Sequence, residues 1–215
     1  MKVGIAQINT KLGDVAANSR KVKKVIDQIG DEADIIVFPE MTLPGYPLHD
    51  RIYDKNLLKS QYAAMLNIQR YIEESKKDLT IILGYIDFTP NKTGSDGKRL
   101  KWNAAAILDG KTMQTYHKRL LPTYDVFYDK RYFQPGDHPT RFPLPNGEVG
   151  AVTICEDMRT DGYEVDPVQE SMSTEKMKIS LSISTALQAV EKGDVIVNQE
   201  KREGSFTKEQ LPQQP

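Results

Sequence analysis

The chain has 215 residues, a formal net charge of −1 and a sequence pI near 6.3, which fits one domain with a substantial core and does not favour binding to a polyanion. No apolar run is long enough to cross a bilayer, and the first residues, MKVGIAQINT, do not resemble an export signal. The single cysteine, Cys155, excludes an intrachain disulfide and fits a reducing compartment, so we expect a cytoplasmic protein that binds neither nucleic acid nor membrane.

Predicted strands and helices alternate in the first half of the chain. Residues 2–9 alternate between apolar and polar side chains, as a strand does, and residues 18–29 carry apolar side chains at helical spacing. The apolar run 33–38 predicts a strand that is buried on both faces. Residues 57–75 predict a second helix. This alternation indicates a layered α/β fold.

Strands dominate the second half. The apolar segments 79–86, 103–108, Met113–His117 and Val149–Ile154 each predict a strand, and polar residues 91–98 predict a hairpin loop after the first of them. A long, aromatic-rich connection separates the last two strands. The pattern predicts one sheet-based domain over most of the chain.

The end of the chain differs in composition. Residues 177–190 predict a helix and 194–198 a short strand, whereas residues 200–215 offer little apolar surface to bury. Ordering one residue costs on the order of 1–2 kcal/mol of backbone entropy, which polar side chains do not offset. We therefore expect a domain over residues 1–170 and a divergent, poorly ordered tail over residues 171–215.

Three reactive side chains, Glu40, Lys118 and Cys155, each stand at the end of a predicted strand. Sites in open α/β sheets lie at the carboxyl ends of the strands, so the three positions are suited to one site. Taken alone, each has an ordinary explanation as a solvated loop charge or a small buried thiol. Taken together, they are the residue types that amide hydrolysis through a thioester requires.

The chemistry explains why these three types belong together. A thiolate must attack the carboxamide carbon, and a free thiol with a pKa of about 8.5 needs help to ionise. A neighbouring carboxylate can accept the thiol proton and later activate water, while a fixed cation stabilises the oxyanion. His49, His117 and His138 are scattered without ligand spacing, so the sequence supports neither a Cys-His dyad nor a metal site.

Four segments, AQINTKLGD, IIVFPEMTLPGYP, YHKRLLPTYDVFYDKRYFQPG and ICED, resemble the nitrilase superfamily, which has Glu, Lys and Cys in this order. The third segment is similar to the glutaminase domain of glutamine-dependent NAD synthetases. The resemblance covers residues 2–170 and implies an α-β-β-α sandwich that is C-terminally incomplete here. It implies that Glu40 is the general base, Lys118 the oxyanion cation and Cys155 the nucleophile, and that Tyr124 lines a glutamine pocket.

The resemblance also implies a function and its partners. The implied reaction is hydrolysis of the L-glutamine amide, which supplies ammonia for ATP-dependent synthesis of NAD from deamido-NAD. The domain that uses ATP and Mg is missing from this chain, so we expect no cofactor or metal here and an NAD synthetase domain as partner. Intact members of the family form homo-oligomers, which we expect here as well.

The chain departs from the family pattern at several positions. Asp125 stands where family members usually have Gly, and Asp129 stands where they have Glu. Asp129 keeps the negative charge of a candidate second carboxylate. The Asn-x-Ser-Pro motif that is expected after the cysteine, and that grips the substrate amino acid, is missing. Apart from Tyr124, three aromatic residues of the connection are expected to make ordinary aromatic packing contacts, namely Phe127, Tyr132 and Phe133.

Two alternative functions remain open. The chain could be a stand-alone amidase or nitrilase that acts on a small amide, although the segment around Tyr124 argues against this. It could also be a truncated, non-catalytic fragment, which the missing Asn-x-Ser-Pro motif favours.

Overall fold

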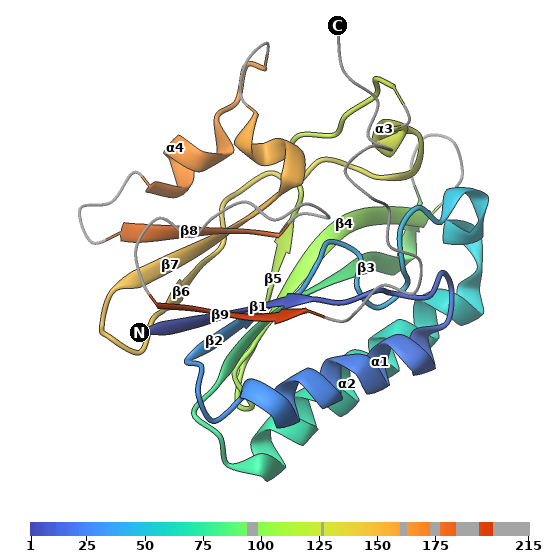
Figure 1. The fold of residues 1–215 in the computed structure, drawn as a ribbon. Helices are drawn as coiled ribbons and strands as arrows, with labels where there is room; N and C mark the ends of the chain where they lie inside the picture. Colours follow the sequence, from blue (N-terminus) through green and yellow to red (C-terminus); the bar gives the residue numbers. More distant parts are fainter. Residues whose placement is uncertain (94–98, 126, 160–162, 173–176, 184–193, 200–215) are drawn as a thin grey trace, which may run out of the picture.

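The computed structural model describes residues 1–93, 99–125, 127–159, 163–172, 177–183 and 194–199. Within these residues the chain forms two β-sheets that face each other, with two long helices along the outer face of the larger sheet (Figure 1). A short helix, α4 (Pro167–Met172), lies against the smaller sheet on the side away from the larger one. This layering confirms the α-β-β-α sandwich that the sequence predicts.

The larger sheet has the strand order β5-β4-β3-β2-β1-β9. Its strands are β1 (Lys2–Gln7), β2 (Ile35–Val37), β3 (Thr80–Thr93), β4 (Arg99–Leu108), β5 (Met113–His117) and β9 (Asp194–Gln199). Strand β1 pairs in parallel with β2 and β9, and β2 pairs in parallel with β3. Strands β3, β4 and β5 pair antiparallel, so β5 runs in the same direction as β2. The carboxyl ends of β2 and β5 therefore lie at the same edge of the sheet.

The smaller sheet has the order β6-β7-β8, with β6 (Arg141–Pro143), β7 (Val149–Ile154) and β8 (Met177–Ile183). Strand β7 pairs antiparallel with β6 and parallel with β8. The core between the two sheets is formed by buried side chains from both of them. The larger sheet contributes Val3, Ile35, Ile82, Ile107 and Tyr116, and the smaller sheet contributes Phe142, Val152 and Ile154.

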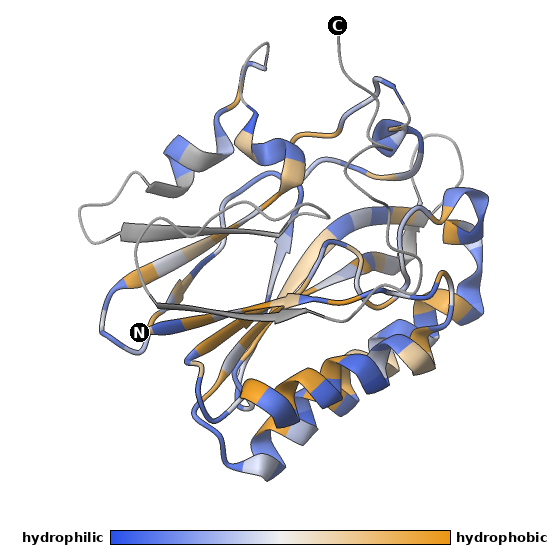
Figure 2. Cartoon of the chain, in the orientation of Figure 1, coloured by the Kyte–Doolittle hydropathy of each residue, from blue (hydrophilic) through white to orange (hydrophobic). Residues whose placement is uncertain are grey.

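A second core lies between the larger sheet and its two helices, α1 (Val15–Ile29) and α2 (Lys55–Ser75). Both helices carry hydrophobic and hydrophilic residues along their length (Figure 2), as amphipathic helices do. The buried members of this core include Val22, Ile26, Ile36, Met65, Ile68, Ile72, Ile81 and Leu83. Acidic N-caps fix where the helices begin, because the side chains of Asp14 and Asp54 accept hydrogen bonds from the first free backbone N–H groups.

Most of the predicted elements are confirmed, two expectations need correction, and one short strand was not predicted. Strand β3 continues to Thr93, into residues that we expected to form a loop, and the remainder of that loop, residues 94–98, lies outside the described residues. Strand β6 was not predicted, because three residues are too few to show a period. The helix predicted over residues 177–190 is wrong for Met177–Ile183, which forms β8. Apolar residues alternate with polar ones there, a period of two that favours a strand.

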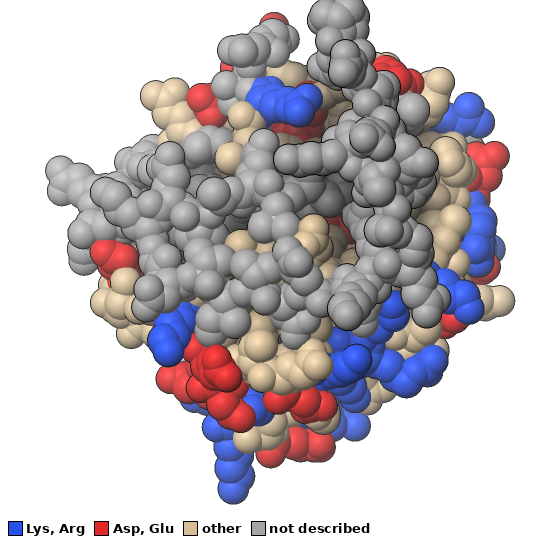
Figure 3. Space-filling model, viewed as in Figure 1, with Lys and Arg blue, Asp and Glu red and all other residues tan. Residues whose placement is uncertain are grey.

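The tail that we expected to be poorly ordered falls only partly within the described residues. The short strand predicted at residues 194–198 is confirmed as β9. Residues 184–193 and 200–215 lie outside the described residues. In the described part of the chain, no helix is both long and apolar enough to span a membrane. Basic and acidic residues are interspersed on the face shown in Figure 3 rather than gathered by sign.

Candidate active site

Glu40 lies just beyond β2, where the chain turns over the end of the larger sheet. Its side chain is buried, with a relative exposure of 5%. The turn passes directly against Gly84 of β3, since a Cβ atom at Gly84 would lie 2.4 Å from both the Pro39 carbonyl oxygen and the Met41 nitrogen. Only glycine permits this close approach. The absence of a side chain at Gly84 thus sets the position of the Glu40 backbone.

Lys118 follows β5 and is buried beside Glu40. Its Nζ donates hydrogen bonds to Glu40 Oε1 at 2.9 Å and to Asp129 Oδ2 at 2.8 Å. Asn103 of β4 donates from Nδ2 to the same Glu40 oxygen at 2.6 Å. The structure therefore brings together Glu40 and Lys118, and adds to them Asp129, the candidate second carboxylate.

This group holds two carboxylates around one ammonium. Burial by itself would lower the pKa of Lys118, but the carboxylates of Glu40 and Asp129 outweigh burial and hold that pKa well above its usual range. Burial raises the pKa of Asp129, although the neighbouring ammonium opposes the shift. Lys118 consequently stays charged at physiological pH and is a permanent cation in a buried position.

Cys155 follows β7 and begins the short 3-10 helix η2 (Cys155–Met158). It has a positive φ of 47°, in the left-handed region that a non-glycine side chain rarely occupies. Strain of this kind persists only where the surroundings enforce it, and it often marks a functional position. The thiol is half-buried beside the core between the sheets.

Tyr46 is affected by the buried charges around Lys118. Burial raises the pKa of the Tyr46 hydroxyl, and the negative charges of Asp129 and Glu40 add to the shift, while Lys118 opposes it. The Tyr46 hydroxyl is therefore influenced by the same buried carboxylates that contact Lys118. Sequence reasoning did not single out Tyr46 or Asn103. The only signal for Tyr46 is its place in the TLPGYP segment.

A further carboxylate, that of Glu156, follows the cysteine directly and is buried with 5% exposure. Tyr124 donates from its hydroxyl to Glu156 Oε2 at 2.6 Å, and Tyr163 donates to Oε1 at 3.1 Å. Arg159 donates from Nη1 to the Tyr124 hydroxyl at 3.5 Å. Tyr124 is itself 44% exposed. Tyr124 is thus partly exposed and is bonded to Glu156, the residue that follows Cys155 in the chain. We call the connected group of Tyr124, Glu156, Arg159 and Tyr163 the rim.

The other aromatic residues of the connection pack as expected. Phe133 is buried, and Tyr132 packs against the same cluster of apolar side chains. Phe127 contacts Tyr124 edge to face, with ring centroids 5.8 Å apart.

Two of the three histidines pair with carboxylates outside the group around Lys118. His117 lies 2.7 Å from Asp87 and stacks on Trp102, and His138 contacts Asp137. Among the residues that the structure describes, no three His, Cys, Asp or Glu side chains are grouped to hold a metal.

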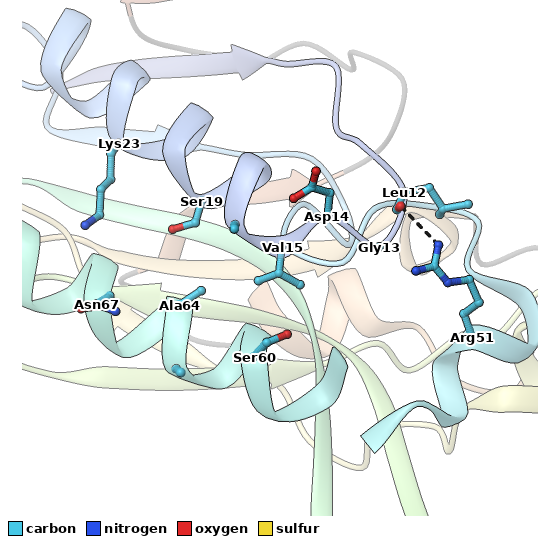
Figure 4. A pocket seen from close by; sticks show the side chains of 12 residues that line it. Leu12, Gly13, Asp14, Val15, Ser19, Lys23, Arg51, Ser60, Ala64 and Asn67 are labelled. Atoms are coloured by element: carbon cyan, nitrogen blue, oxygen red, sulfur yellow. Dashed lines mark hydrogen bonds between the residues drawn. The ribbon is translucent and has the colours of Figure 1, made fainter. Parts of the chain in front are cut away.

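An open groove of about 750 Å³ between α1 and α2 contains none of these residues (Figure 4). Its lining includes Asp14, Lys23, Ser60 and Asn67, and Arg51 closes one end by donating to the Leu12 carbonyl oxygen at 3.4 Å. The groove lies on the helical face of the larger sheet. It is a gap between two helices and does not contribute to the candidate site.

Comparison with known proteins agrees with this geometry. The profile of the family described as carbon-nitrogen hydrolase matches residues 2–169. A glutamine-dependent NAD(+) synthetase from Thermotoga maritima is 34% identical over 161 residues, which are 74% of this chain and 26% of that protein. The corresponding enzyme from Acinetobacter baylyi is 31% identical over 188 residues, or 86% of this chain and 30% of that protein. The chain thus spans less than a third of the length of these relatives.

Solved structures show the same fold. A glutamine-dependent NAD+ synthetase from Acinetobacter baumannii matches with a TM-score of 0.69 and 29% identity, covering 87% of this chain and 33% of that one. An amidase from Nesterenkonia sp. matches with a TM-score of 0.66 and 16% identity, covering 85% of this chain and 64% of that one. At that lower identity the amidase supports the fold alone.

Proposed function

Because the chain belongs to the carbon-nitrogen hydrolase family, we propose that it hydrolyses the side-chain amide of L-glutamine through a thioester on Cys155. The observation that carries the proposal is the buried contact, at 2.9 Å, between the Lys118 ammonium and the Glu40 carboxylate. The relatives named above, which are glutamine-dependent NAD(+) synthetases, support glutamine as the substrate.

The proposed reaction uses each member of the group in turn. Glu40 accepts the thiol proton, and the Cys155 thiolate attacks the carboxamide carbon. Lys118 and the backbone N–H after the cysteine stabilise the oxyanion. When the intermediate collapses, the C–N bond breaks and the amide nitrogen leaves as ammonia with the proton from Glu40. Glu40 then takes a proton from water, which attacks the thioester and releases glutamate and the thiol.

We assign recognition of the amino acid part of glutamine to the rim beside the nucleophile. The Glu156 carboxylate, held by two tyrosine hydroxyls, is suited to an ammonium group, and Arg159 is suited to a carboxylate. Tyr124 lies between these two charges and accordingly lines the proposed pocket.

The proposed partner follows from the product. The hydrolytic reaction needs no cofactor, and its ammonia would be consumed by an NAD synthetase domain that uses ATP and Mg to convert deamido-NAD to NAD. We propose that this domain acts together with the chain in the cytoplasm, and that the assembly is homo-oligomeric. Size measurement of the purified chain with and without a synthetase domain tests these two points.

A small-amide amidase is the second candidate. The Nesterenkonia amidase shares the fold at 16% identity and does not decide between the two candidates. The two candidates differ in the substrate that releases ammonia. If the rim binds both charged groups of an amino acid, glutamine should release ammonia much faster than butyramide or acetamide does. The reverse order would favour the amidase.

Cys155 provides the most direct test. We expect a thiol-reactive glutamine analogue to add once to the wild-type chain, because Cys155 is the sole cysteine. Intact-mass measurement and peptide mapping should place the adduct on Cys155, and ammonia release from glutamine should disappear in Cys155→Ala. An adduct that persists in Cys155→Ala, or a wild-type chain that neither labels nor releases ammonia, would refute the proposal and favour a non-catalytic fragment.

A further inference from the structure

Asp157 lies two residues after Cys155, and its carboxylate accepts four hydrogen bonds. Oδ1 accepts from the backbone N–H groups of Arg119 at 3.0 Å and Leu120 at 2.8 Å. Oδ2 accepts from the backbone N–H of Ile154 at 2.9 Å and from the Tyr116 hydroxyl at 2.8 Å. The side chain of Asp157 is fully buried. Each of its oxygens is therefore saturated by donors from the protein.

The four donors come from two different layers of the sandwich. Tyr116 belongs to β5 in the larger sheet, and Arg119 and Leu120 directly follow Lys118. Ile154 ends β7 in the smaller sheet and immediately precedes Cys155. One carboxylate thus joins the segment that carries the cation to the turn that carries the thiol.

The bond to Ile154 has a second effect, on the conformation of Cys155. It closes a tight turn from residue 154 to residue 157, and Cys155, with its φ of 47°, lies inside that turn. A positive φ at a non-glycine residue needs external support. Asp157 supplies part of that support while also fixing the segment after Lys118.

We propose that Asp157 is a positioning residue that sets the placement of the Lys118 ammonium relative to the Cys155 thiol by bridging the two sheets. This inference rests on the proposed function for its catalytic consequence. Burial raises the pKa of the Asp157 carboxyl, whereas the N–H donors of Leu120 and Ile154 oppose that shift. An amide at position 157 would keep the size of the side chain but offer one oxygen to four donors, so one pair of donors would be left unmatched.

The test is Asp157→Asn, assayed in two ways. We expect kcat for glutamine to fall roughly 100-fold with little change in KM, because a misplacement of about 1 Å in a catalytic group costs about that factor. We also expect the pH midpoint for alkylation of Cys155 by iodoacetamide to move to higher pH, since a displaced cation no longer favours the thiolate. A role confined to stability would move neither the alkylation midpoint nor kcat in the folded protein.

Two further variants make the comparison specific. Asp109 lies in the turn between β4 and β5, where its carboxylate accepts hydrogen bonds from Lys111 and Thr112. These are not residues of the site, so Asp109→Asn should leave both measurements at wild-type values. Tyr116→Phe removes one of the four donors to Asp157 and should shift alkylation in the same direction by a smaller amount. If circular dichroism shows that Asp157→Asn does not fold, the alkylation midpoint of Tyr116→Phe tests the positioning role instead.

The outcomes separate this inference from the proposed function. A folded Asp157→Asn chain with an unchanged alkylation midpoint and unchanged kcat overturns the positioning role. If Asp157→Asn does not fold, an unchanged midpoint in Tyr116→Phe overturns it. A wild-type chain that does not hydrolyse glutamine, combined with a shifted midpoint in the variants, overturns the function and leaves the positioning role standing.

Discussion

Lys118 determines the charge balance of the buried site. Its ammonium lies 2.9 Å from Glu40 and 2.8 Å from Asp129, and the side chains of all three residues are almost completely buried. Removing one partner of a buried ion pair costs about 3–5 kcal/mol, because the remaining charge is left without compensation in a poorly solvating environment. The cation that stabilises an oxyanion in the proposed mechanism therefore also stabilises the fold.

We predict that Lys118→Met lowers the free energy of unfolding by about 3–5 kcal/mol at neutral pH. Burial already raises the pKa of Asp129 beside Lys118, and loss of the cation should raise it further. A carboxyl group whose pKa is higher in the folded than in the unfolded chain contributes stability at low pH and loses it as pH rises through the folded pKa. The stability lost in Lys118→Met should therefore be smallest below about pH 4 and should increase toward neutral pH.

Urea denaturation at acidic and neutral pH checks this prediction. Lys59→Met is the matched control, because Lys59 is exposed on α2 and its replacement should change stability by no more than about 0.5 kcal/mol. A Lys118→Met chain as stable as wild type at neutral pH would contradict the ion-pair account.

At the scale of single elements, the ends of α2 show how local chemistry sets a boundary. The Asp54 carboxylate accepts hydrogen bonds from the backbone N–H groups of Asn56 at 2.8 Å and Leu57 at 3.3 Å. At the other end the chain leaves the helix through Lys76, which has a φ of 56°. The helix therefore begins at a side-chain cap and ends at a left-handed residue, as α-helices commonly do.

We predict that Asp54→Ala lowers the free energy of unfolding by about 0.5–2 kcal/mol, because two backbone donors lose their acceptor. Thermal and urea unfolding of the variant measure the loss. Lys55→Ala, at the adjacent exposed position, serves as the control and should be nearly neutral. If both variants lose the same stability, the cap does not explain the effect.

At the scale of the whole molecule, the larger sheet is covered on both faces by separate cores. Ile68 is buried in the core under α1 and α2, and Ile82 in the core between the sheets, both with no exposure. Ile81 and Ile82 are adjacent in β3 but face opposite cores. Because one strand contributes to both cores, disrupting the packing of one core should also destabilise the other through the sheet.

We predict that Ile68→Ala and Ile82→Ala each lower the free energy of unfolding by about 2–5 kcal/mol and that both variants retain one unfolding transition. Circular dichroism and the fluorescence of Trp102, the single tryptophan, should give coincident curves. Two separate transitions in either variant would show that the layers unfold independently and would refute a single domain.

The sequence by itself determined most of the local elements and suggested which side chains are reactive. Periods of two and of about 3.6 residues are properties of neighbouring positions, so they located most strands and both long helices. Glu40, Lys118 and Cys155 were found because each ends an element that could be recognised locally. Periodicity did not reveal β6, which is too short, and β8 was wrongly predicted as a helix from a helical period.

The tertiary structure decided how those side chains are joined. Glu40 and Lys118 are 78 positions apart in the sequence, and Asp157 reaches back 38 positions to Arg119. Such contacts depend on the stacking of two sheets and on the antiparallel return from β3 to β5, which no local period encodes. Asn103, Tyr46 and Asp157 were therefore not recognised from sequence, because their importance lies in what they touch and not in what adjoins them along the chain.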